Sequence, residues 1–75
     1  MKILVFGVLQ DVVGKSEFEM EAGSDLDSFR KDLLQAYPLL KNYQFQIAVN
    51  KEKVESNPGL IESDEIALLP PYAGG

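Results

Sequence analysis

The sequence predicts an α+β domain: a mixed sheet of about five strands with one main helix packed on one face. Two observations support this prediction. The most apolar segments are residues 2–9 and 65–69, near the two ends of the chain, which indicates two adjacent central strands. Between them lies one stripe of apolar residues at helical spacing, and a single helix must pack against a sheet to bury such a stripe.

The first segments predict a β-hairpin. Residues 2–9 are an almost unbroken apolar run that ends at Gln10-Asp11. The stretch 12–14, Val-Val-Gly, supplies a turn. Residues 15–21 then alternate polar and apolar side chains, which is typical of a half-exposed strand.

The main helix is expected to begin after Ser24 and to end near Ala36 or Tyr37. Ser24 is a good N-cap residue, and Pro38 disfavours helical backbone at the residue before it. Apolar residues recur at spacings of three and four along this segment, so one side of the helix should face the core. These residues are Leu26, Phe29, Leu33 and Tyr37.

The rest of the chain predicts three more strands. Residues 44–49 alternate and form the third strand; a tight turn at 50–53 leads to a short strand at Val54-Glu55. After a turn at 57–59, Leu60 and Ile61 are expected to fill the core from a loop. Residues 65–69 form the last strand. This element order is that of the β-grasp, or ubiquitin-like, fold, with a domain over residues 1–69 and an extended tail over residues 70–75.

The composition excludes several classes of function. The 75 residues include no cysteine and no histidine, so disulfides and thiolate or imidazole metal sites are absent, and no metal site is expected. A net charge of −5, from 12 acidic and 7 basic residues, argues against nucleic-acid binding. No stretch approaches the ~20 apolar residues of a membrane span, so the cytoplasm is the expected compartment. No side-chain pair suits acid–base chemistry, and the chain is not expected to be a catalyst alone.

The C-terminal segment is the first candidate functional surface. Pro70 and Pro71 cannot donate hydrogen bonds to a sheet and favour an extended backbone, so they should project the end of the chain away from the body. Gly74 and Gly75 have no side chains, so a narrow tunnel in another protein could admit them. Such an end suits acyl chemistry on the Gly75 carboxylate after activation, although an idle tail would have the same sequence.

The open face of the sheet is the second candidate surface. One helix cannot cover both sides of a sheet, and alternation along the strands predicts apolar side chains on the uncovered side. An exposed apolar patch of this kind usually marks a partner interface. The alternative is that strand twist or the chain near residues 41–43 covers it. The predicted interface residues are Leu4, Phe6, Ala48, Ala67 and Leu69.

Several stretches carry a resemblance to a known family. Residues 64–75 read as an acidic turn, an apolar strand, Pro-Pro, two variable residues and Gly-Gly; residues 48–50 are Ala-Val-Asn before a turn. Phe6-Gly7, Val13-Gly14, Leu33 and Tyr37-Pro38 add weaker matches. With these features the chain resembles the small subunits of molybdopterin synthase, which are ubiquitin-like sulfur carriers. The likeness spans nearly the whole chain, and its specificity lies in the last dozen residues.

The resemblance implies a mechanism. An activating enzyme would use ATP to adenylate the Gly75 carboxylate, and sulfur from a donor enzyme would replace AMP to leave a thiocarboxylate. The tail, from Pro70 and Pro71 through Tyr72, Ala73 and Gly74, would insert into the large synthase subunit. There the sulfur would pass to cyclic pyranopterin monophosphate. The resemblance implies no permanently bound cofactor.

One departure and three rival functions remain at this point. Many family members carry Arg-Glu where this chain has Gln10-Asp11, which leaves the detailed partner contact open. The rivals are a sulfur carrier of thiamine thiazole synthesis, a ubiquitin-like protein modifier and a non-covalent β-grasp interaction module. The Pro70-Pro71 strand exit argues against the thiamine carrier, which does not typically show it.

Overall fold

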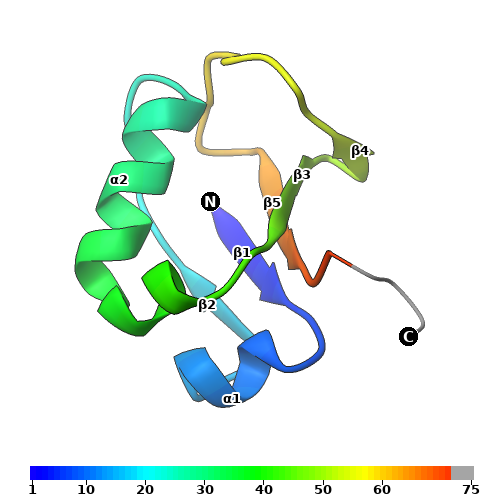
Figure 1. Ribbon diagram of the computed structural model, residues 1–75. Coiled ribbons are helices and arrows are strands. Elements are labelled where there is room, and N and C mark those ends of the chain that lie inside the picture. Colours follow the sequence, from blue (N-terminus) through cyan, green and yellow to red (C-terminus); the bar gives the residue numbers. More distant parts are fainter. Residues whose placement is uncertain (72–75) are drawn as a thin grey trace.

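The computed structural model, which describes residues 1–71, confirms the predicted α+β architecture. Its sheet has the strand order β2-β1-β5-β3-β4. The central strands β1 (Lys2–Val5) and β5 (Glu65–Leu69) are parallel neighbours, as their apolarity predicted. β2 (Glu17–Glu19) pairs antiparallel with β1, β3 (Gln46–Val49) with β5, and β4 (Glu52–Lys53) with β3. Figure 1 shows α2 lying along one side of this sheet.

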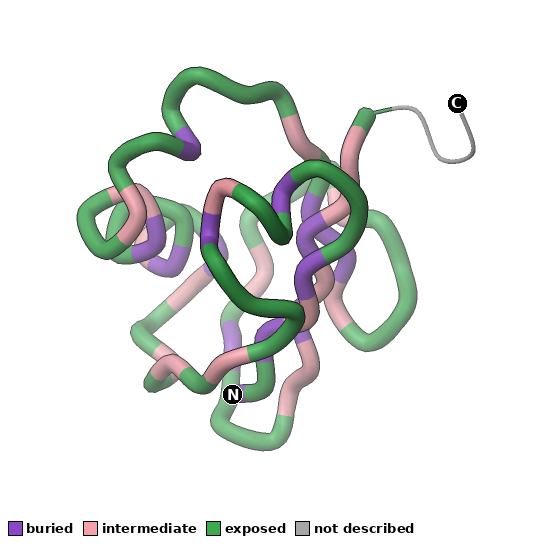
Figure 2. Tube along the Cα trace, turned by 90° about the horizontal axis from the view of Figure 1, so that it is seen from below, coloured by how far each residue is buried: buried purple, intermediate pink, exposed green. Residues whose placement is uncertain are grey.

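The core lies between the sheet and its helices. α2 (Leu26–Ala36) contributes the buried stripe Leu26, Phe29 and Leu33, as predicted. Figure 2 shows buried positions recurring along the strands and along one side of the helical coil. The buried core cluster consists of Met1, Ile3, Val5, Leu9, Val13, Leu26, Phe29, Leu33, Leu40, Ile47, Leu60, Ile66 and Leu68.

The apolar run near the start of the chain is only half a strand, which corrects the prediction of a strand over 2–9 and a turn over 12–14. β1 ends at Val5, the chain turns at Gly7 (φ +61°), and a short helix α1 (Leu9–Val13) follows. Leu9 and Val13 are four residues apart, so they lie on the same side of α1, and both are buried. Apolar residues at this spacing can be buried on one side of a helix or on one face of a strand. Gly14, at φ +88°, ends α1, and its N–H donates to the Gln10 carbonyl.

The start of α2 also differs from expectation. The N-cap is Asp25 rather than Ser24: the Asp25 carboxylate accepts a hydrogen bond from the Ser28 N–H at 2.9 Å. The helix ends at Ala36 as predicted, and Tyr37 packs beside Phe18 with ring centroids 5.0 Å apart. A 3₁₀ helix that the sequence did not indicate, η1 (Pro38–Asn42), then buries Leu40.

The hairpin after β3 is tighter than predicted. Asn50 and Lys51 have φ values of 51° and 73°, so they form a two-residue turn of the type that matches strand twist. β4 therefore lies at Glu52–Lys53, within the segment predicted as turn, and not at Val54-Glu55. Two consecutive residues with positive φ are uncommon outside glycine, which is why the predicted turn covered all of residues 50–53 and not the two residues Asn50 and Lys51 alone.

The loop before β5 corrects one further expectation. Leu60 is buried in the core as predicted, but Ile61 is 64% exposed and does not fill it. The Asn50 side chain connects the β3–β4 turn to this loop: its Nδ2 donates to Asp64 and its Oδ1 accepts from the Glu65 N–H, both at 2.9 Å. These bonds fix the point at which β5 begins.

Candidate functional site

β5 is held on both sides up to its last residue. It pairs with β1 from Glu65 to Leu68 and with β3 from Ile66 to Leu69, where Leu69 lies opposite Gln46. One residue beyond β1, the Phe6 N–H still donates to the Leu68 carbonyl at 3.1 Å. The strand that precedes the C-terminal segment is therefore a fixed part of the sheet.

Pro70 packs against Gly7 where the chain leaves the sheet. A Cβ atom placed on Gly7 would lie 2.8 Å from the Pro70 Cγ, a distance that real Cβ contacts do not show. Gly7 also has a positive φ, which side chains disfavour. Pro70 is half-buried, whereas Pro71 is exposed and is the last residue that the structure describes. The position of Pro70, directly after β5, thus depends on the absence of a side chain at Gly7.

The remaining predicted tail residues, Tyr72, Ala73, Gly74 and Gly75, lie outside the described residues. Their role in tail insertion and the role of the Gly75 carboxylate stay predictions. The division into a domain over 1–69 and a tail over 70–75 also stays a prediction, and the described part adds only that Pro70 contacts the body.

The open face of the sheet carries the predicted apolar residues. Register places Glu17, Leu4, Ala67, Ala48 and Lys53 in one row across β2, β1, β5, β3 and β4. The row runs from an acidic edge through an apolar centre to a basic edge. None of these five side chains belongs to the core cluster, which lies on the side of the sheet facing α2.

The contribution of each predicted interface residue differs. Phe6 is 43% exposed and offers the largest apolar surface, while Leu4, Ala67 and Leu69 are half-buried. Ala48, by contrast, is only 4% exposed, which corrects the expectation that it presents surface to a partner. Its short side chain sits in register between Ala67 and Lys53, and neighbouring groups cover it. Ala48 can therefore provide a flat floor but little contact area.

Gln10 makes a contact within the chain. Its Nε2 donates to the Val5 carbonyl at 2.9 Å and so connects α1 to the end of β1. The Gln10 amide therefore stabilises the β1–α1 connection, and the contact of Gln10-Asp11 with a partner stays a prediction.

Two carboxylates hold the opposite end of β5. Hydrogen bonds from the Ala22 N–H and then from the Met1 ammonium group lower the pKa of Glu62. The pKa of Asp64 is lowered by the Ile61 N–H and then by the Asn50 amide. Both carboxylates are stabilised in the ionised form, so both support the loop that leads into β5.

Sequence reasoning missed the pairing of Gly7 with Pro70. Gly7 was visible only as a single glycine after an apolar run, and Pro70 only as a residue that ends a strand. The contact arises because β1 and β5 are parallel neighbours whose ends lie side by side, a relation that depends on the assembled sheet.

Within residues 1–71, no helix combines the length and apolarity that crossing a bilayer requires.

Comparison with known proteins places the whole chain in one group. The ThiS family model matches residues 3–75. The molybdopterin synthase sulfur carrier subunit of Caenorhabditis elegans is 32% identical over 81 residues, covering 100% of this chain and 96% of that protein. The similarity thus includes the C-terminal segment that the structure leaves undescribed.

Two solved structures share the fold. The complex of subunits 1 and 2 of molybdopterin-converting factor from Helicobacter pylori 26695 contains a chain with a TM-score of 0.74 and 30% identity. That match covers 99% of this chain and 96% of the other. The small archaeal modifier protein 1 of Methanosarcina acetivorans has a TM-score of 0.79 and 26% identity, covering 99% of this chain and 94% of that one.

Proposed function

The chain belongs to the ThiS family, and from this premise we propose that it is the sulfur carrier subunit of a molybdopterin synthase. The observation that carries the proposal is the way β5 delivers the C-terminal segment. The strand is paired with β1 to Leu68 and with β3 to Leu69, and Pro70 packs against Gly7. Because β5 and Pro70 are fixed, the C-terminal segment leaves the body at a defined position, which lowers the entropy cost of binding it to a partner enzyme.

The reactive atom in this proposal is the carboxyl carbon of Gly75. The free carboxylate is inert to nucleophiles, so an activating enzyme first uses ATP to form an acyl-adenylate and releases pyrophosphate. A donor enzyme then supplies sulfur at the oxidation level of sulfide, which attacks the carboxyl carbon and displaces AMP, and the product is a thiocarboxylate. A thiocarboxylate ionises more readily than a thiol and is a good sulfur nucleophile, so a chain without cysteine can donate sulfur.

The large synthase subunit is the proposed acceptor of the charged tail. Pro70 through Gly74 would insert into it, and the sulfur would pass to cyclic pyranopterin monophosphate, after which the carrier leaves as a carboxylate. The catalytic pocket belongs to the large subunit in this scheme, so the carrier needs no permanently bound cofactor. A cytoplasmic location is part of the same proposal.

The open face is the proposed contact surface for these partners. Leu4, Phe6, Ala67 and Leu69 supply its apolar area, with Ala48 as a flat element between them. Glu17 and Lys53 at opposite edges would fix the orientation of a partner, because complementary charges favour one docking arrangement over others.

Reconstitution with the large subunit tests the proposal. Phe6→Asp places a charge on the open face, and we expect weaker binding to the purified large subunit by isothermal titration calorimetry and less molybdopterin formed. Phe6 is 43% exposed, so losing the buried part of its ring should cost about 1 kcal/mol of stability, and the unfolding midpoint is measured to show that the variant stays folded. Leu39→Asp, at a position that is 61% exposed on η1, is the matched control. Equal loss of binding in both variants would remove the open face from the proposed interface.

A second candidate is covalent protein modification, favoured by the likeness to the small archaeal modifier protein 1. Both candidates need an activated Gly75, but a modifier would form an isopeptide with a lysine of another protein. Higher-mass conjugates that resist thiol reductants and contain Gly75 linked to lysine would support the modifier. Sulfur transfer in the reconstituted synthase without such conjugates would support the carrier.

A further inference from the structure

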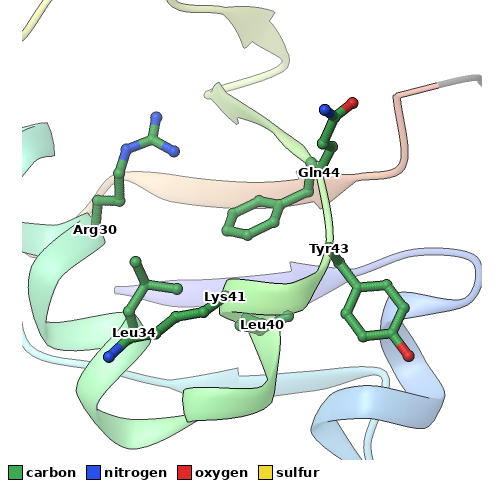
Figure 3. Close-up of a pocket in the computed structure, with 7 residues that line it drawn as sticks. Arg30, Leu34, Leu40, Lys41, Tyr43 and Gln44 are labelled. Carbon is green, nitrogen blue, oxygen red and sulfur yellow. The ribbon is translucent and has the colours of Figure 1, made fainter.

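A groove separates α2 and η1 from the edge of the sheet at β3. Arg30 and Leu34 reach into it from α2, and Leu40 and Lys41 come from η1 (Figure 3). Its volume is about 300 Å³. A second hollow of about 250 Å³ continues past Arg30 towards β4 and the residues that follow it. The two hollows share Arg30 and Phe45, so they form one continuous surface.

The groove is basic on an acidic protein. Arg30 and Lys41 are the charged residues that line the first hollow, whereas Arg30, Lys53 and Glu55 line the second, so the basic character is concentrated in the first. Among residues 1–71, the ion pairs within 4.0 Å involve the Met1 ammonium group and Lys2, so these three cations have no carboxylate partner in the described part of the chain. The whole chain carries a net charge of −5. An acidic partner would therefore be repelled by most of the surface and attracted here.

The walls between the cations are apolar. Leu34, Leu40 and Phe45 line the first hollow, and Ile47 and Val54 line the second. Leu40 and Ile47 are already buried, but a free phosphate or similar small anion would leave the half-buried Leu34, Phe45 and Val54 in contact with water. The cations are also distributed along two hollows instead of converging on one point. A chain with alternating acidic and apolar side chains fits both features.

The edge of β3 offers a place for an extended backbone. β4 pairs with Ala48 and Val49, and beyond it the Val54 N–H donates to the Ile47 carbonyl at 3.4 Å, so the uncovered part of this edge lies before Ile47. An exposed strand edge can accept an extended peptide while neighbouring hollows receive its side chains.

We propose that this groove binds an extended acidic segment of a partner protein. Apolar side chains of the segment lie against Leu34 and Phe45, and its carboxylates face Arg30 and Lys41. These residues belong to α2, η1 and the segment just before β3, whereas Lys53 stands in the row of the open face. The proposal is thus tested at Arg30 and Lys41, which the proposed partner surface does not include.

Titration of the ¹⁵N-labelled protein with a synthetic peptide of alternating aspartate and leucine tests this proposal. We expect saturable amide shifts at Arg30, Phe45 and Val54, and an affinity that falls as salt rises. Arg30→Glu should weaken binding by about tenfold or more, given the energies of close charge pairs at interfaces. Lys31→Glu is the matched control: it makes the same charge change at the next helix position, on a residue that does not line the groove. Its effect should be at most about twofold, because a long-range charge effect is screened by salt.

Three outcomes would overturn the proposal. Equal weakening by Arg30→Glu and Lys31→Glu would show that net charge alone controls binding. Shifts centred on Leu4 and Ala67 would place the peptide on the open face. Comparable binding of inorganic pyrophosphate at the same residues would make the groove a general anion site. Lys41→Glu, on η1, repeats the test from another element should Arg30→Glu not fold, and mass analysis of charging at Gly75 should be unchanged in either variant.

Discussion

Gly7 and Pro70 are far apart in sequence, yet their contact determines where the C-terminal segment leaves the body. Gly7 combines two properties that only glycine supplies here: a positive φ and space for the Pro70 ring. Pro70 ends the pairing of β5 because it has no N–H to donate. The two residues together convert the end of a central strand into a defined exit.

Replacing Gly7 by alanine should therefore destabilise the protein. The left-handed backbone alone costs roughly 1–2 kcal/mol in a residue with a side chain, and the contact with Pro70 adds to it. Gly14→Ala is the control, since Gly14 also has a positive φ but a Cβ added there would meet no atom within 4 Å. Urea unfolding should show a larger loss for Gly7→Ala; equal losses would mean that the Pro70 contact contributes nothing.

The lowered pKa values of Glu62 and Asp64 predict a loss of stability in acid. Their ordinary values are 4.5 and 3.8, and both are lower in the folded protein. Below these ordinary values the unfolded chain binds more protons than the folded one. The stabilisation is thus complete above about pH 4.5 and is lost as the pH falls through the folded pKa values.

Thermal unfolding between about pH 6 and pH 3 measures this effect. The unfolding midpoint should fall with pH, and Glu62→Gln combined with Asp64→Asn should make the dependence shallower. Glu21→Gln removes a nearby exposed carboxylate and should leave the slope nearly unchanged. An unaltered slope in the double variant would show that these two hydrogen-bonded carboxylates do not control acid stability.

Among the helices, the spacing of apolar side chains predicted α2 but not α1. The buried stripe of α2 was predicted from the spacing of its apolar residues, and its end at Ala36 was predicted from Pro38. An apolar pattern that repeats over this length can be buried on one side only if the segment is a helix. α1 is too short for that argument: Leu9 and Val13 fit a strand or a helix equally well. In the structure the chain turns at Gly7, beside Pro70, and Leu9 and Val13 are buried on a helix.

The N-cap of α2 gives a direct test at this scale. Asp25→Ala should cost about 1 kcal/mol, within the usual 0.5–2 kcal/mol range, because the Ser28 N–H loses its acceptor. Ser24→Ala should cost less, since Ser24 contributes its backbone carbonyl, which accepts a hydrogen bond from the Leu60 N–H and is kept in alanine. Chemical unfolding of the two variants compares them. A larger loss of unfolding free energy for Ser24→Ala than for Asp25→Ala would show that Ser24, the residue predicted from the sequence, is the N-cap.

The molecule as a whole was largely predictable because apolarity orders its strands. The most apolar segments became the central pair β1 and β5, and alternation correctly placed Leu4, Ala67 and Leu69 on the open face. Alternation could not show that Ala48 is covered, because its exposure depends on neighbouring strands. The basic groove was also not foreseen: Arg30, Lys41 and Lys53 come from separate elements and meet only in the fold.

The central claim is that this body presents Gly75 for charging with sulfur. The core is built from residues between Met1 and Leu68, so deletion of Gly75 should leave the unfolding midpoint nearly unchanged while abolishing charging. The deletion variant therefore separates chemistry from folding.

Intact mass spectrometry after co-expression with an activating enzyme and a sulfur source tests the claim most directly. We expect a mass gain equal to the exchange of one oxygen for one sulfur, located at the C-terminal glycine and missing from the deletion variant. An unchanged mass, together with no adenylate in the presence of ATP, would contradict it.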